Sequence, residues 1–348
     1  MPDLAEYTLI QSAKVSQEAP SNIALVKYWG KKEIQIPTNS SLSFTLTKAK
    51  TKTEVGIEKK SGEGFEVVVY FEGNQNEKFK EKILKFFERI HPFVPFLQSY
   101  RFEIHTENTF PHSSGIASSA SGFAALALCL VEIEILLGAD FSPQKKQLKS
   151  SFLARLGSGS ACRSVYKGLV YWGENPNIKG SNKRFAIEAP FEVAPVFKTF
   201  RDTILLIEEG QKKVSSTAGH ALMENHPYRD RRFELAEENI LKFQEIFKNG
   251  DLKAFVALVE QEALGLHSLM MTSSPPYLLM STNTLVAINL IWEYRRQTDL
   301  PLCFTLDAGA NLHLLYPESC QEEVGEFVKE MLAPLCSDKK YIEDTICW

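Results

Sequence analysis

The fold of this chain is decided by the stretch ENTFPHSSGIASSASGF at residues 107–123, where small and hydroxyl side chains crowd the start of a long apolar segment. That segment predicts a helix, and the first N–H groups of a helix lack intrahelical partners and carry a partial positive charge. Side chains small enough to let an anion reach this backbone are those of Gly115, Ala117 and Ala120. Hydroxyls able to bind phosphate oxygens or magnesium belong to Ser118, Ser119 and Ser121. The stretch predicts a phosphate site, although an isolated cluster of this kind is more often an ordinary loop and helix cap.

The composition indicates a globular protein. Its 348 residues, 44% hydrophobic and 24% charged, make a chain that is long for one core, so we expect two domains. The net charge of −4 argues against nucleic-acid binding through a basic surface, so an anionic ligand must be held locally. Residues 122–137 are apolar, but they are few and include Glu132 and Glu134, which favours a buried helix over a membrane span.

The cysteines indicate a reducing compartment. The chain has 6 of them, with no Cys-x-x-Cys pair and no zinc spacing. The first 20 residues contain acidic side chains and no uninterrupted apolar core, so we expect no secretory signal. These features predict a cytoplasmic protein without a nucleic-acid or membrane partner.

Hydrophobic periodicity divides the chain near residues 185–200, with a β-rich half before that point and a helix-rich α+β half after it. In the first half the pattern predicts strands over 41–47, 53–58, 65–71 and 100–105, and helices over 77–90, from the serine-rich stretch to about 137, and from Pro143 onward. In the second half it predicts strands over 203–207, 302–306 and 312–316, and helices over 228–248, 251–271, 282–297 and 320–332.

A second stretch that could take part in binding or catalysis is APSNIALVKYWGK at residues 19–31, which places Lys27, Tyr28 and Lys31 after a short apolar strand. Lysines there could neutralise phosphate oxygens. A single lysine is usually only solvated, but a tyrosine, a tryptophan and a glycine between two lysines are harder to explain as ordinary surface.

A third stretch, GSGSACRS at residues 157–164, offers two glycines, three hydroxyls and Arg163. Such a turn can form an anion-binding nest, and a guanidinium is a planar fork suited to a carboxylate or phosphate. A helix cap followed by a surface arginine explains the same residues equally well.

A fourth stretch, TLDAGAN at residues 305–311, places Asp307 at the end of an apolar strand, where it could accept a proton from a hydroxyl during phosphoryl transfer. An Asx turn is the usual explanation of an isolated aspartate there. Residues 212–219 could add hydroxyls and positive charge for a second anionic group, or form a polar loop before a helix. We expect His267 to be structural and the charged run 229–238 to be a solvated helix face.

Taken together and in this order, these stretches resemble the GHMP kinase superfamily and, within it, the diphosphomevalonate decarboxylases. The pattern Pro-x3-Gly-Ile-Ala-Ser-Ser at 111–119 is similar to the superfamily's phosphate loop, which lacks the Gly-Lys-Ser/Thr ending of a Walker-type loop. Residues more specific to the decarboxylases are those at 22–31, 157–164 and 307–311. Further similarity at 37–43, 266–267 and 275–276 extends the resemblance over nearly the whole chain.

The resemblance implies a two-domain α+β fold of the GHMP kinase type. Residues 1–190 would form an N-terminal domain like ribosomal protein S5 domain 2, carrying the phosphate loop, and residues 191–348 a ferredoxin-like C-terminal domain. ATP, with magnesium, and mevalonate 5-diphosphate would meet in the cleft between them. The implied reaction phosphorylates the 3-hydroxyl, after which loss of phosphate and carbon dioxide gives isopentenyl diphosphate. The resemblance also implies a homodimer.

The site residues follow from the resemblance, position by position. Asp307 would orient or deprotonate the 3-hydroxyl, and Arg163 would hold the substrate carboxylate. The resemblance also implies substrate contacts by Tyr28, Lys31, Ser158, Ser160, Ser215 and Ser216. It places Lys31 among the catalytic residues as well. Those implied to hold the ATP phosphates are Pro111, Gly115, Ala117, Ser118, Ser119 and Ser121. The resemblance does not identify the magnesium ligands.

The chain departs from the family pattern at three places. Ala310 stands where many relatives have proline, His112-Ser113-Ser114 replaces smaller residues in the loop, and the connection 31–37 is short. None of these removes a charged group, so they bear on substrate preference more than on ATP use. The alternatives are a related mevalonate 3-kinase, a phosphomevalonate decarboxylase, or a catalytically silent ligand-binding member of the fold.

Overall fold

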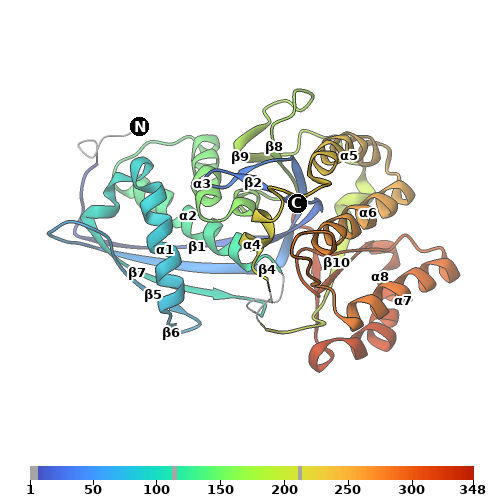
Figure 1. Cartoon of the computed structure of the whole chain (residues 1–348). Helices are drawn as coiled ribbons and strands as arrows, with labels where there is room; N and C mark the ends of the chain where they lie inside the picture. Colours follow the sequence, from blue (N-terminus) through green and yellow to red (C-terminus); the bar gives the residue numbers. More distant parts are fainter. Residues whose placement is uncertain (1–6, 112–115, 211–213) are drawn as a thin grey trace.

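The computed structural model describes residues 7–111, 116–210 and 214–348 of the chain. Two β-sheets, each covered by helices, lie side by side, with the N-terminal half at the left of Figure 1 and the C-terminal half at the right. A separate ribbon of two short strands, β2 (Lys31–Lys32) and β3 (Ile36–Pro37), lies at the edge of the first half.

The first sheet is mixed, with strand order β6-β5-β7-β4-β8-β9 and with β1 paired to β4. Only β5 and β7 run parallel; the remaining pairs are antiparallel. Its strands are β1 (Ser12–Val26), β4 (Ser41–Lys59), β5 (Glu66–Phe71), β6 (Asn74–Gln75), β7 (Tyr100–Asn108), β8 (Leu169–Gly173) and β9 (Asn182–Glu188). The two strands predicted over 41–47 and 53–58 are one continuous strand, β4, because the polar residues between them alternate in and out of the sheet without a turn.

Three helices cover this sheet: α1 (Glu77–Ile90), α2 (Ser118–Leu136) and α3 (Pro143–Gly157). Helix α2 packs against β1, β4 and α3, and small side chains such as Ala120 and Ala124 let it approach closely. It is long and apolar enough to span a membrane, but 61% of its most apolar window is buried within the fold. Its hydrophobicity is therefore that of a central core helix, as the sequence predicted.

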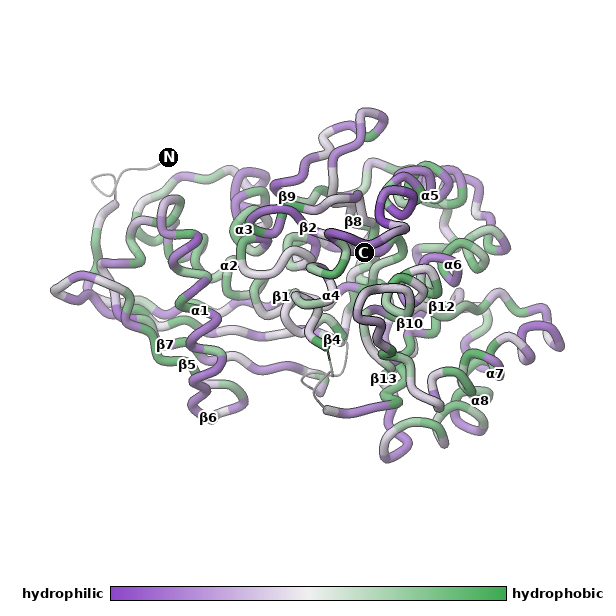
Figure 2. Tube along the Cα trace, in the orientation of Figure 1, coloured by the Kyte–Doolittle hydropathy of each residue, from purple (hydrophilic) through white to green (hydrophobic). Residues whose placement is uncertain are grey.

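The second sheet is antiparallel, with strand order β11-β12-β10-β13. Its strands are β10 (Phe200–Leu205), β11 (Cys303–Thr305), β12 (Leu312–Pro317) and β13 (Tyr341–Thr345). The helices of the C-terminal half are α4 (Ser216–Ala221), α5 (Arg229–Asn249), α6 (Leu252–Met271), α7 (Thr282–Thr298) and α8 (Gln321–Phe327), and α4 lies against Tyr28 and Trp29 of the first half. Much of the α5 trace is coloured hydrophilic in Figure 2, in keeping with its charged sequence.

Several further elements differ from the sequence prediction, among them β9, β13 and the last helix. Strands β9 and β13 carry mostly polar residues, so their pattern gave no strand signal; they form because a neighbouring strand offers free backbone groups. The helix expected over 320–332 is shorter, since α8 ends at Phe327 and continues as a π-helical turn over Val328–Leu332.

The two halves share a hydrophobic core. Between ring centroids, Phe44 of β4 lies 5.7 Å from Phe247 and 6.3 Å from Phe200, both in the second half. The carboxylate of Asp344 accepts three backbone N–H groups of residues 47–49, at 3.0, 2.7 and 2.6 Å. The C-terminal strand is thereby attached to the first sheet, and the two walls of the cleft between the halves are held in place.

Candidate active site

A cleft of about 470 Å³ lies between the two halves and brings together Lys31, Arg163 and Asp307, which come from three distant stretches of the chain. Most of the predicted site residues line the same cleft: Tyr28, Ala117, Ser118, Ser119, Ser158, Ser160 and Ser215. The C-terminal half contributes Asp307, Ala308, Ser215, Thr217, Leu266 and His220, of which only His220 lies outside the stretches named from the sequence.

The carboxylate of Asp307 forms an ion pair with Lys27, at 2.8 Å between Oδ1 and Nζ. Asp307 follows β11 in the second half, whereas Lys27 is the first residue after β1 in the first half. The Lys27 side chain is 1% exposed and that of Asp307 is 28% exposed, so the ammonium is enclosed while the carboxylate faces the cleft. The aspartate is thus held by a cation, which argues against a simple Asx turn.

The ion pair controls the charge state of Asp307. Burial by itself would raise the pKa of this carboxyl, but the Lys27 ammonium, together with His313 and Arg163, outweighs that effect, and the pKa lies below its usual value. Burial also lowers the pKa of Lys27, and the attraction of Asp307 opposes this change. We conclude that Asp307 is ionised at neutral pH and can accept a hydrogen bond from a substrate hydroxyl.

Arg163 is buried at 2% exposure, so the alternative of a surface arginine is wrong. It lies in the 3-10 turn Gly159–Val165 after α3. Its Nη1 donates to Ser41 Oγ at 2.6 Å, and Nε and Nη2 both donate to Asn22 Oδ1, at 3.3 and 3.1 Å. These three bonds orient the guanidinium and leave two of its five N–H groups for a ligand in the cleft.

The glycines of this turn are required by close packing. A Cβ on Gly159 would lie 2.7 Å from Tyr28 Oη, and one on Gly157 would lie 2.3 Å from the ring of Phe123. The hydroxyl of Tyr28 is buried and has no protein partner among the described residues. Because a buried hydroxyl without a partner is costly, this atom is suited to bind a ligand oxygen.

Helix α1 contributes cations that the sequence analysis missed: Lys82, Lys85 and Arg89 line the cleft. The sequence contained a signal for these three residues. They recur at helical spacing on the polar side of a helix whose opposite side buries Ile83, Phe86, Phe87 and Ile90. With Lys27, Lys31 and Arg163, six cationic side chains of the described residues line the cleft, against one carboxylate, that of Asp307. Such an excess of positive charge fits a ligand with several negative charges.

The start of α2 has the features of a phosphate site. Ala117 adopts a left-handed conformation (φ 46°, ψ 37°), and within the described part of the chain no side chain caps the helix, so its first N–H groups can bind a ligand. The hydroxyls of Ser118 and Ser119 line the cleft, and Ser119 Oγ lies 3.3 Å from Ser158 Oγ. These groups fit the oxygens of a polyphosphate and of a hydrated divalent cation, although the described residues include no group of three or more His, Cys, Asp or Glu that could hold a metal.

Two of the predicted phosphate contacts do not lie at the cleft. Ser121 is fully buried, and its hydroxyl lies 2.6 Å from Thr51 Oγ1 on the sheet side of α2. The helical period places Ser121 opposite Ser119, and although it shares a side with Ser118 it lies nearly one turn further along the helix, where that side meets the sheet. Pro111 precedes the loop and is not among the lining residues. Gly115 and the side chain of Ser216 lie outside the part of the chain that is described.

His220 of α4 is enclosed between the rings of Tyr28 and Trp29, with centroids at 4.4 and 4.6 Å. Its Nδ1 accepts the backbone N–H of Gly30 at 2.9 Å, so the neutral ring carries its proton on Nε2. Burial, and to a lesser degree Lys31, lowers the pKa of His220 to about 3. The cleft therefore contains a neutral imidazole. His267, expected to be structural, is buried with Nε2 at 3.1 Å from the backbone oxygen of Asp307.

Comparison with known families accounts for both halves of the chain. Residues 19–183 match the diphosphomevalonate decarboxylase-like N-terminal domain, and residues 203–346 match the mevalonate 5-diphosphate decarboxylase C-terminal domain. The diphosphomevalonate decarboxylase of Gibberella zeae is 31% identical over 320 residues, which cover 88% of this chain and 81% of that protein. The enzyme of Bos taurus is 29% identical over 352 residues, covering 94% and 83%.

Solved structures give the same result. The chain is similar to MDDEF in complex with MVAPP, AMPPCP and magnesium, with a TM-score of 0.81, 29% identity and coverage of 96% of this chain and 97% of that one. It is also similar to mevalonate diphosphate decarboxylase from Staphylococcus aureus, with a TM-score of 0.81, 26% identity and coverage of 96% of each chain.

Proposed function

Because the chain belongs to the diphosphomevalonate decarboxylase family, we propose that its cleft catalyses the ATP-dependent decarboxylation of mevalonate 5-diphosphate to isopentenyl diphosphate. The fold is the two-domain GHMP kinase fold that the sequence predicted. The observation that supports this proposal most directly is that Asp307, Arg163 and the start of α2 lie in one cationic cleft.

Asp307 acts on the 3-hydroxyl of the substrate. Its low pKa keeps it ionised, so it orients the hydroxyl through a hydrogen bond and accepts the proton as the oxygen is phosphorylated. Lys27, at 2.8 Å, stabilises the carboxylate before the transfer and limits how early the proton moves. ATP supplies the phosphoryl group, and magnesium offsets the negative charge of its phosphates.

Arg163 orients the substrate carboxylate. A carboxylate bound by the two remaining N–H groups of the guanidinium is fixed in direction, because Asn22 and Ser41 hold the other three. Departure of the 3-phosphate develops positive charge at a tertiary carbon. The C–C bond to the aligned carboxylate then breaks, carbon dioxide leaves, and the electron pair of that bond forms the double bond to the tertiary carbon.

The diphosphate end of the substrate needs cations away from Asp307. Lys31 and the three basic residues of α1 meet this need, and Tyr28, Ser158, Ser160 and Ser215 supply hydroxyls. The start of α2 holds the phosphates of ATP through Ser118 and Ser119. Cations in this number favour a diphosphate over a monophosphate.

Two broader features remain proposals. The division into domains near residue 190 is supported by β9 ending at Glu188 in one sheet and β10 beginning at Phe200 in the other. A cytoplasmic homodimer is supported by the unpaired cysteines of the described residues and by the exposed apolar side chains of Leu278 and Leu285. Light scattering of the purified protein tests the dimer.

Product analysis tests the reaction. Purified protein with ATP and magnesium is given mevalonate, its 5-phosphate and its 5-diphosphate in parallel, and ADP and carbon dioxide are measured. We expect equal amounts of both products with the 5-diphosphate. ADP without carbon dioxide would instead identify a 3-kinase, preference for the 5-phosphate a phosphomevalonate decarboxylase, and binding without turnover a silent member of the fold.

A further inference from the structure

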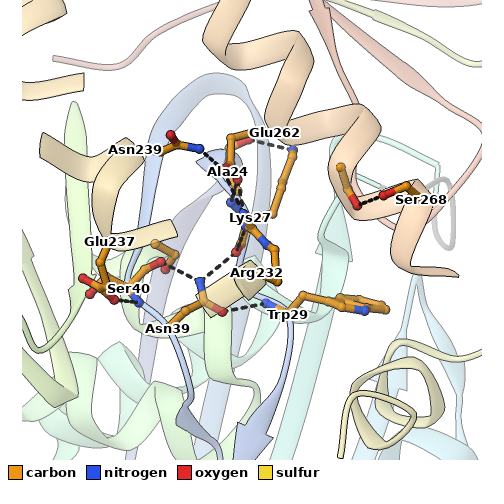
Figure 3. Close-up of polar contacts among 12 residues, drawn as sticks. Ala24, Lys27, Trp29, Asn39, Ser40, Arg232, Glu237, Asn239, Glu262 and Ser268 are labelled. Atoms are coloured by element: carbon orange, nitrogen blue, oxygen red, sulfur yellow. Dashed lines mark hydrogen bonds and ion pairs between the residues drawn. The ribbon is translucent and has the colours of Figure 1, made fainter. Parts of the chain in front are cut away.

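A buried polar cluster lies directly behind Lys27 and is not part of the cleft lining. It consists of Glu262 on α6 with Arg232 and Asn239 on α5, and we call it the Lys27 clamp (Figure 3). The side chains of Arg232 and Glu262 are 6% and 1% exposed, and Asn239 is fully buried. The charged run 229–238 was expected to be a solvated helix face, and Arg232 is the residue in it for which that expectation is wrong.

The clamp binds both backbone polar groups of Lys27. Glu262 Oε2 accepts the Lys27 N–H at 2.9 Å, and Arg232 Nη2 donates to the Lys27 carbonyl at 2.9 Å. Arg232 also donates to both oxygens of Glu262, at 2.9 and 2.8 Å, and Asn239 donates to Oε1 at 2.6 Å. Every bond from Glu262 and Arg232 to Lys27 therefore crosses from the second half of the molecule to the first.

The position of Lys27 explains why a clamp is needed. The pairing of β1 with β4 ends at Val26, so Lys27 is the first residue whose backbone has no partner in the sheet. Asn39 of the first half donates to its carbonyl at 3.0 Å, but its N–H is bound by Glu262 of the second half. Its side chain is bound at the far end, where Nζ donates to Asp307 at 2.8 Å and to the Ala24 carbonyl at 2.7 Å. A lysine bound at both ends has one accessible geometry, because movement of its backbone would pull the ammonium away from the carboxylate.

Stability alone does not account for the clamp. Removing a carboxylate and a guanidinium from water is costly, and a protein with apolar residues of similar size in place of a buried ion pair is often equally stable. A buried ion pair does, however, fix a unique arrangement of the segments that it joins. Here the joined segments are the end of β1 and the two helices α5 and α6.

We propose that Glu262, with Arg232, is a positioning residue of the reaction, which fixes the backbone of Lys27 from the second half so that its ammonium stays on Asp307. This inference rests on the proposed function, since it assigns Asp307 to the reacting hydroxyl. A displacement of about 1 Å at a reacting group can lower a rate about a hundredfold, so a clamp behind the cleft can influence turnover without touching substrate.

The same helix provides a matched control. Glu260 of α6 forms a comparable ion pair with Arg295, at 2.6 Å, and accepts the indole N–H of Trp292 at 2.8 Å. Its side chain is 9% exposed, yet none of these three residues lines the cleft or contacts Lys27. Glu260→Gln therefore weakens a partly buried ion pair on α6 in the same chemical way. Its one bond toward Asp307, from the Phe304 N–H of β11, is long at 3.4 Å, and the amide oxygen of a glutamine can still accept it, so mainly stability should respond.

The experiment compares Glu262→Gln with Glu260→Gln in the full chain, below the melting temperature of both. We expect both variants to melt at lower temperature than the wild type. Glu262→Gln should lower kcat about ten- to a hundredfold, with KM for ATP and for the mevalonate substrate within about threefold of the wild type, whereas Glu260→Gln should keep kcat within about twofold. Arg232→Lys, which retains the charge but not the fork, should give an intermediate loss.

A double-variant cycle identifies the route of the effect. In a Lys27→Met background, Glu262→Gln should add less than about a threefold further loss, because the residue it positions is already absent. Full additivity in that background would overturn the inference, as would a kcat for Glu262→Gln equal to that of the wild type, or an equal loss in Glu260→Gln.

A crystallographic readout keeps this test separate from the proposed reaction. In crystals of Glu262→Gln the distance from residue 27 Nζ to Asp307 Oδ1 should exceed about 3.5 Å, while Glu260→Gln should keep the ion pair. This expectation holds even if the wild type acts on a different mevalonate derivative. An unchanged distance in both variants would refute the positioning role.

Discussion

The ammonium of Lys27 lies 2.8 Å from the carboxylate of Asp307, although 280 residues separate them in the chain. One residue comes from each half of the molecule, so the pair exists only when both halves are folded against each other. This ion pair keeps Asp307, which faces the substrate hydroxyl, in its ionised form.

Asp307→Ala should lower kcat by at least about a hundredfold, the scale of a lost general base, with a smaller change in KM. The substitution also leaves the Lys27 ammonium buried without its counter-ion. Steady-state kinetics with both substrates measures the effect, and Asp230→Asn on the exposed surface of α5 serves as the control. An active Asp307→Ala enzyme would exclude the role given to this carboxylate.

Arg163→Lys should lower kcat by at least about tenfold, although the positive charge is retained. A lysine cannot reproduce the three bonds to Asn22 and Ser41 and still present two parallel N–H groups to a carboxylate. Release of carbon dioxide should fall further than formation of ADP, since the carboxylate is the group that loses its orientation. Near-normal decarboxylation in this variant would remove Arg163 from that assignment.

The cations of α1 should act on affinity. We expect Lys85→Ala to raise KM for the diphosphate substrate about three- to tenfold at low salt, with little change in kcat, and the effect should shrink as salt screens the cleft. Lys80→Ala is the matched control, because Lys80 is on the same helix and pairs with Glu77 away from the cleft. Equal effects of the two substitutions would contradict the placement of the diphosphate beside α1.

His220 should make the fold sensitive to mild acid. The unfolded chain protonates this residue near the ordinary pKa of 6.5, whereas the folded protein does so only near a pKa of about 3. Since the unfolded state binds the proton first, stability is lost as the pH falls below 6.5, by up to about 1.4 kcal/mol per pH unit.

Urea unfolding at two pH values checks this expectation. Between pH of about 7 and about 5.5, the wild type should lose about 1 kcal/mol more stability than His220→Gln, whose amide oxygen can still accept the Gly30 N–H. A wild type and variant that lose stability in parallel would show that His220 is not the group responsible.

Much of the site could be predicted from sequence, because its components are local. Helix α1 spans the predicted residues 77–90, since apolar spacing and the Asn76 cap are properties of neighbouring residues. The turn around Gly159 and the start of α2 could be recognised for the same reason.

Two of the departures from the family pattern have different outcomes. Residues 112–114 lie outside the described residues, while the carbonyl of Ala310 accepts a hydrogen bond from Thr284 Oγ1 at 2.7 Å.

The sequence by itself determined the chemical types in the cleft: a strand-end aspartate, a guanidinium in a glycine turn, and serines at a helix start. Only the tertiary structure decided that Lys27 rather than Lys31 pairs with Asp307, that Ser121 faces the sheet, and that Arg232 is buried. Spacing along the chain fixes what a residue can do within one turn or strand, whereas the partner of a buried charge is chosen by the packing of the two halves, which no local pattern records.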